Sequence, residues 1–138
     1  MKTTLEVLEK LKEIIEKKLN YKNFSVVLDY PDSDRCLKET TIFLMPDTGL
    51  LENLTTGSDS CSLDVTAYII VRRRGSQDLM IKVFDCFEQL YSLLRGDPSL
   101  EGYVSDTEIR DFDYYPSTGN ESEKAIEVSL NVLWEKDF

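Results

Sequence analysis

The sequence contains no histidine among its 138 residues, and this absence excludes several kinds of chemistry. Histidine is the commonest general base, the usual zinc ligand and the proton acceptor of Ser-His and Cys-His nucleophile pairs. The three cysteines, Cys36, Cys61 and Cys86, are too few and too widely spaced to build a four-ligand zinc or iron–sulfur site within one chain. Glycine-rich phosphate loops of the standard spacings are also missing. We therefore expect no cofactor, no metal site and no enzymatic activity.

Long apolar runs are absent as well. No stretch of about 18 consecutive apolar residues occurs, so we expect no membrane span. Residues 1–6 lead directly into a charged amphipathic pattern and lack the apolar segment of a signal peptide. An odd number of cysteines without a Cys-x-x-Cys pair is typical of free thiols in a reducing compartment. We therefore expect the protein to be made in a cytoplasm.

Basic residues are scarce compared with acidic ones. The chain has 16 Lys and Arg against 26 Asp and Glu, which gives a formal net charge of −10. Attraction to phosphate drives nucleic-acid affinity, so a globally acidic chain is a poor nucleic-acid binder. The same charge would suit a surface past which nucleic acid slides without binding.

Hydrophobic periodicity predicts two helices, over residues 3–20 and 77–95. In both, apolar residues recur at steps of three and four. Strands are predicted where apolar residues alternate or cluster between turn residues, over 24–29, 39–45, 60–74, 101–115 and 124–134. Short, turn-rich links favour antiparallel pairing. The fold class we expect is a single α+β domain spanning residues 1–138, with a mainly antiparallel sheet of four to five strands and both helices packed on one face.

Three local features carry more specific expectations. Ser76 is the expected N-cap of the second helix, with Asp78 in its first turn. The segment 101–115 alternates only loosely, so we expect it at an edge of the sheet or half exposed. Residues 46–59 hold few apolar side chains besides leucines, and we expect a mobile loop there, containing Asp47, Leu50 and Leu51.

Two charged clusters are candidate sites. The basic cluster is Arg72, Arg73 and Arg74, in which the first and third side chains of a strand point one way and the second points the other. It is either a charged strand end that discourages edge pairing or a contact for carboxylates of another subunit. The acidic cluster consists of Asp106, Glu108, Asp111 and Asp113. It is a solvated strand face, a site for a hard cation, or a carboxylate pair for hydrolysis.

The second half of the sequence resembles a known family. An alternating strand ends in Val71-Arg72-Arg73-Arg74-Gly75, and an amphipathic helix then ends in Leu93-Leu94. A tyrosine-rich strand, a glycine-containing turn and a final strand with Val128, Leu130 and Val132 follow. This pattern over residues 60–134 resembles the tail terminator and minor tail proteins of long-tailed bacteriophages and prophages.

The resemblance implies a structural protein of the virion tail, assembled in the host cytoplasm. Members of that family form a ring, typically a hexamer, that caps the tail tube, ends its polymerisation and docks it to the head. The implied partners are further copies of the chain, the tail tube protein and a head-completion protein. DNA would pass through the lumen of the ring without specific binding, and the net charge of −10 is compatible with such a lumen.

Ring closure requires a heterologous contact between two different faces of neighbouring subunits. From the residues, we expect the arginines of 72–74 to meet the acidic segment 106–113 of the next subunit. The loop 46–59 would become ordered on contact with the tube or the head. Two other functions stay open: a head-completion or stopper protein of the same particle, and a small ligand-binding α+β regulatory domain.

Overall fold

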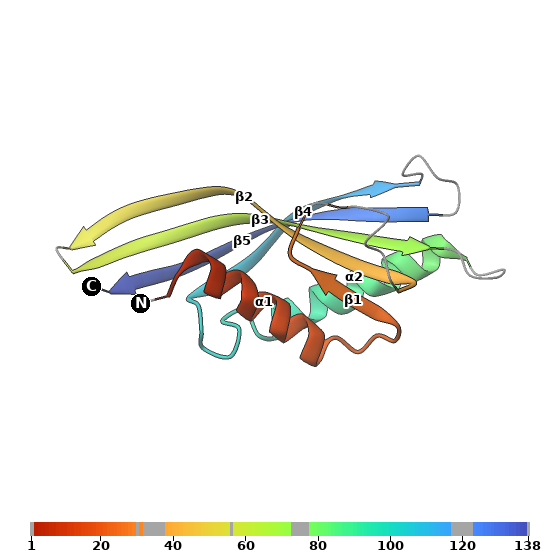
Figure 1. The fold of residues 1–138 in the computed structure, drawn as a ribbon, viewed down its shortest axis with the longest axis horizontal. Coiled ribbons are helices and arrows are strands. Elements are labelled where there is room, and N and C mark those ends of the chain that lie inside the picture. The colour runs from red at the N-terminus through yellow and green to blue at the C-terminus, as the bar shows by residue number, and fades with distance from the viewer. Residues whose placement is uncertain are drawn as a thin grey trace.

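The computed structural model describes residues 2–29, 31, 38–55, 57–72, 78–116 and 123–137. These residues form two helices and five strands (Figure 1). In chain order the elements are α1 (Thr4–Lys18), β1 (Phe24–Val27), β2 (Thr40–Thr55), β3 (Ser58–Arg72), α2 (Leu79–Gly96), β4 (Asp106–Tyr115) and β5 (Glu123–Asp137). The strands make one sheet in the order β1-β2-β3-β5-β4, in which only β1 and β2 are parallel. The protein is therefore an α+β fold with a mostly antiparallel sheet, as the sequence predicts.

Both helices cover the same face of the sheet (Figure 1). Their apolar stripes face the sheet because residues three and four positions apart share one side of a helix. Strands β3 and β5 present alternate side chains to this layer, and the resulting core contains residues from Val7 to Trp134. Cys61 and Cys86 are buried free thiols, and burial raises the pKa of Cys86 to about 12. Cys36 lies outside the described residues.

The helix starts follow capping rules. Thr3 caps α1, its side-chain oxygen accepting a hydrogen bond from the Glu6 N–H at 3.1 Å. Asp78 caps α2, and its carboxylate accepts from the N–H groups of Met80 and Ile81 at 3.1 and 3.4 Å. The prediction of Ser76 as N-cap is therefore wrong, and Ser76 itself lies outside the described residues. A carboxylate fits this position well because its charge complements the helix dipole.

The predicted loop over residues 46–59 is wrong. β2 continues to Thr55 and β3 already starts at Ser58, so the two strands form a long hairpin that extends beyond the helices (Figure 1). Pro46 does not end β2. Among the described residues, β1 pairs with β2 only over residues 40–43, so the outer side of β2 has no described partner strand at Pro46. The missing N–H of proline costs no backbone hydrogen bond there. A register shift between Pro46 and Gly49 accommodates the extra residue.

Candidate functional site

The described part of the chain offers no evident catalytic or metal centre. Within it, no three side chains of His, Cys, Asp or Glu gather in a way that could hold a metal ion. Neither described helix is long and apolar enough to cross a membrane. Two exposed surfaces are the candidate sites instead. We call them the arm, which comprises residues 47–55 of β2 and 58–62 of β3, and the β4 edge, which comprises β4 and the adjoining side of α2.

The arm exposes leucines to solvent. Leu50, Leu51 and Leu54 are 69%, 74% and 48% exposed. Leu51 pairs with Cys61 on the face of the sheet that α1 and α2 cover. Leu50 pairs with Ser62 on the opposite face, which we call the open face. The arm therefore presents apolar side chains on both of its faces, which is typical of a surface that contacts another molecule.

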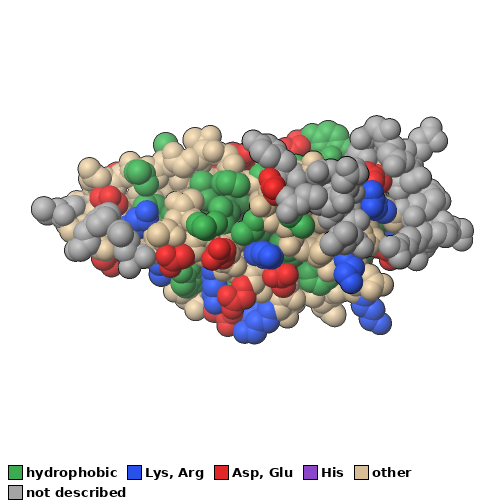
Figure 2. Space-filling view, viewed as in Figure 1, with side chains coloured by type: hydrophobic (Ala, Val, Ile, Leu, Met, Phe, Trp, Pro, Cys, Tyr) green, Lys and Arg blue, Asp and Glu red, His purple; other side chains and the backbone are tan. Residues whose placement is uncertain are grey.

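Neighbouring features extend the apolar surface of the arm. Ser62 pairs in turn with Leu133, a partly exposed residue of β5, so that the row through Leu50 continues across the open face. In Figure 2, hydrophobic side chains gather over the middle of the molecule beside the base of the arm, whereas charged side chains of both signs line the edge formed by α1. Asp47 lies at the base of the arm, where its carboxylate accepts a hydrogen bond from the Thr66 hydroxyl. Asp47 thus helps to hold the bulge from which the arm extends.

The β4 edge is the terminal strand of the sheet. β4 pairs with β5 on one side, and no other described strand pairs with it. A register shift between Ile109 and Asp111 inserts Arg110 as an extra residue. This bulge explains the loose alternation of the sequence, because it returns Phe112 and Tyr114 to the same face as Ile109. The prediction of an edge strand here is confirmed.

On its open face β4 carries the acidic cluster. Asp106, Glu108, Asp111 and Asp113 are all exposed along one side of the strand. Arg110 also reaches this face and contacts the carboxylate of Asp64 on β3 at 3.3 Å. The cluster is therefore a solvated row of negative charge at the free edge.

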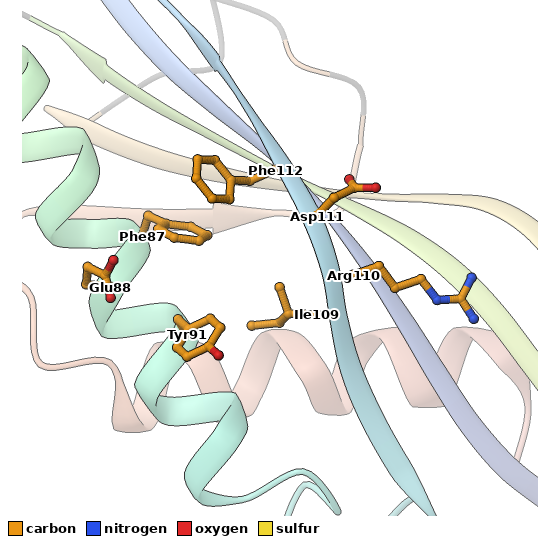
Figure 3. Close-up of a pocket in the computed structure, with 7 residues that line it drawn as sticks. All are labelled: Phe87, Glu88, Tyr91, Ile109, Arg110, Asp111 and Phe112. Atoms are coloured by element: carbon orange, nitrogen blue, oxygen red, sulfur yellow. The ribbon is translucent and has the colours of Figure 1, made fainter.

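On its other face β4 forms an aromatic groove with α2. Phe112 lies against Phe87, with ring centroids 4.6 Å apart, and edge-on to Phe84 at 6.2 Å. Phe112 and Tyr91 are nevertheless 45% and 41% exposed. Figure 3 shows Ile109 and Phe112 pointing toward α2, whereas Arg110 and Asp111 point away from it. The groove has a volume of about 510 Å³, and Glu88, Arg110 and Asp111 also line it.

The end of β4 is tied to the open face of the sheet. The Tyr115 hydroxyl donates a hydrogen bond to Glu127 on β5 at 2.7 Å. This hydrogen bond and the negative charge of Glu127 raise the pKa of Tyr115 to about 12. The Tyr115 ring also lies beside Tyr68 on β3, with centroids 6.1 Å apart.

The structure places Arg72 far from most of the acidic cluster. Arg72 ends β3, and its Nε donates to the buried carboxylate of Glu123 at 2.9 Å. Asp106 pairs with Leu133 of β5, which pairs on its other side with Ser62 of β3. Ser62 precedes Arg72 by ten residues in that strand. Arg73 and Arg74 lie outside the described residues. Arg72 thus has a structural partner within its own chain, and the expected contact with a neighbouring subunit stays a prediction.

The aromatic groove was not foreseen as a site. Phe87 and Tyr91 follow the helical period like any core residue, and Phe112 falls in a weakly patterned strand. The sequence shows only a break in the alternation at Arg110. That break can be recognised as a bulge only when β4 is aligned with its partner strand β5.

The comparisons with known proteins add no family. No family model matches the sequence, and no curated protein matches it. The fold and the two exposed surfaces are therefore the features from which a function can be inferred.

Proposed function

We propose that this chain is a structural subunit of a phage or prophage tail, of the tail terminator class. Copies of it form a ring that caps the tail tube, ends its polymerisation and docks it to the head. The observation that carries the proposal is the arm, which exposes three leucines beyond the helical layer. Such a surface is suited to a neighbouring protein because burying a leucine on association removes a large apolar area from water.

Two further properties support an assembly role. The arm of one copy can meet a different surface of its neighbour, and head-to-tail contact of this kind is what closes a ring. The net charge of −10 is compatible with a lumen that DNA crosses without binding. The arm residues Leu50 and Leu51 are the contacts we propose between copies, whereas the acidic cluster on β4 is the contact we propose for the tail tube or the head. A head-completion protein of the same particle would use the same surfaces toward another partner.

The test compares two charge-matched double variants. Leu50→Glu/Leu51→Glu places carboxylates on the arm, and Leu5→Glu/Ile81→Glu places them on helix positions of similar exposure. Light scattering and negative-stain imaging of the unchanged protein, alone and with purified tail tubes, should show a closed oligomer with a central hole. The arm variant should remain monomeric with an unchanged melting temperature, and the helix variant should assemble. Assembly of the arm variant, or failure of the unchanged protein to cap tubes, would contradict the proposal.

A small ligand-binding domain is the second candidate, and the groove between α2 and β4 favours it. Its volume of about 510 Å³ is within the range of ligand pockets. Such a ligand would raise the melting temperature of a monomer in a thermal-shift screen without causing assembly. Saturable stabilisation by a small molecule, lost in Phe112→Ser, would favour this candidate over the ring.

A further inference from the structure

We propose that the β4 edge binds an extended segment of a partner protein by strand addition, and that this segment alternates apolar side chains with lysine or arginine. This partner binds at one surface, and its binding does not depend on ring formation through the arm. Its chemistry follows from the position of β4 in the sheet, from the different chemistry of the two faces of β4, and from the charge of the strands that could pair with it.

The backbone of β4 is available for pairing. β4 lies at one edge of the sheet. Among the described strands, it pairs with β5 only. The alternate N–H and C=O groups on its outer side therefore point away from the sheet. An extended peptide that adds to such an edge gains main-chain hydrogen bonds without rearranging the fold.

The two faces of the edge select different side chains. An added strand places alternate residues over the two faces, close to the cross-strand residues of β4. On the helix side these neighbours are Ile109 and the half-exposed Phe112, next to Tyr91 of α2. Apolar side chains on that side of the added strand would fill the aromatic groove. Such burial would cover rings that the chain itself leaves exposed.

The open face selects positive charge. On this face β4 carries four carboxylates, those of Asp106, Glu108, Asp111 and Asp113. Arg110 does not neutralise this row, because it already contacts Asp64 on β3 at 3.3 Å. Opposite charges on neighbouring strands stabilise pairing, and like charges destabilise it. The charges that protect the edge against acidic and uncharged strands thus favour a basic one.

A second copy of the chain is a poor occupant. Antiparallel pairing of β4 with another β4 would set one acidic row beside another, and like charges on neighbouring strands destabilise pairing. The other described strands carry few basic residues, and none has two of them on one face two positions apart. A different protein that presents a basic, alternating segment fits the edge better.

The test uses fluorescent nine-residue peptides and anisotropy. The first peptide alternates lysine and valine, the second has the same side chains with every backbone amide N-methylated, and the third alternates glutamate and valine. The first peptide should bind and should slow hydrogen exchange of amides in residues 106–115. The second and third should bind more than about tenfold more weakly, because they lack donors or carry the wrong charge. Equal binding of the N-methylated peptide would overturn strand addition.

Two variants with equal changes in charge locate the site. Asp111→Lys/Asp113→Lys reverses charge on β4, and Glu9→Lys/Glu16→Lys reverses it on exposed positions of α1. Only the β4 variant should lose affinity for the lysine peptide, by more than about tenfold. Equal losses in both variants would show adsorption governed by net charge and would overturn the proposal. Protection of residues 106–115 that rises with protein concentration in the absence of peptide would identify a second copy as the occupant and would also overturn it.

The outcome of the peptide-binding experiment can be distinguished from the outcome of the ring-formation experiment. The same titration on the arm variant Leu50→Glu/Leu51→Glu measures the β4 edge in a chain designed not to assemble. Peptide binding without ring formation would support the β4 inference alone. Ring formation by the unchanged protein without peptide binding would support the proposed function alone.

Discussion

The two ends of the sheet differ although the same strands build them. At the end opposite the arm, which we call the body end and which comprises residues 40–45 of β2 and 66–72 of β3, the strands lie over the helices, and Ile42 and Leu44 are fully buried. The open face of this end is also occupied, by a small cluster in which Phe43, Ile70 and Ala125 are buried. At the arm end, the leucines of β2 are exposed on both faces.

The row that crosses the base of the arm shows where the cover ends. Leu51, Cys61 and Trp134 are cross-strand neighbours on the helix side. Cys61 and Trp134 are almost fully buried, whereas Leu51 is mostly exposed. In this row, the apolar layer that packs on the helix side of the sheet therefore buries the side chains of β5 and β3 but not that of β2. Leucine stabilises the fold at one end of β2 and is available to a partner at the other, so residue type alone does not separate the two roles.

Leu44→Ala should produce the largest effect. It removes a fully buried side chain from the body end and should lower the free energy of unfolding by about 2–5 kcal/mol. The matched change Leu51→Ala, in the arm of the same strand, should change it by less than about 0.5 kcal/mol. Urea denaturation of the monomer measures both. Equal losses would mean that the arm belongs to the cooperative core and would remove the contrast between the two ends.

Arg72→Ala should have an intermediate effect. Glu123 is only 2% exposed, so loss of its contact with the Arg72 guanidinium should cost about 1–3 kcal/mol. Arg110→Ala is the control, because the contact between Arg110 and Asp64 is solvent-exposed and should contribute about 0–1 kcal/mol. Thermal or urea unfolding of both variants measures the difference. A larger loss for Arg110→Ala would contradict the buried ion pair as the stronger of the two contacts.

Much of the fold could be predicted because its periods are strong. The second helix, predicted over 77–95, is observed at Leu79–Gly96, and the last strand, predicted over 124–134, at Glu123–Asp137. Each of these elements buries one face, so its apolar residues recur with the period of the helix or strand.

The candidate surfaces were predicted less well for the same physical reason. The arm buries neither face of residues 47–54 of β2, so this stretch shows no alternation, and the sequence predicts a loop over 46–59 in its place. In β4 the extra residue Arg110 shifts the alternation by one position. A bulge depends on how two distant strands pair, which local periodicity does not encode. Leu50, Leu51 and the acidic cluster could be named from the sequence, but their arrangement required the sheet.

Glu127→Gln should give the smallest effect, which appears only at alkaline pH. The hydrogen bond to Glu127 and the charge of this carboxylate raise the pKa of Tyr115 to about 12 and so favour the neutral phenol in the folded state. The stability from this contact is fully present below the ordinary tyrosine pKa of about 10 and is lost as the pH rises toward 12. In Glu127→Gln the pKa should fall toward its ordinary value, as measured by the tyrosinate absorbance that is missing in Tyr115→Phe.

Glu135→Gln provides the control at the arm end of β5. Glu135 pairs with Ser60 of the arm on the same open face, so its replacement should leave the titration of Tyr115 unchanged. An equal shift in both variants would mean that the tyrosine senses only the overall charge of the open face. A shift in Glu127→Gln alone would mean that this face is organised by specific contacts at the body end. The difference between the ends of the sheet would then extend to the face that the helices leave open.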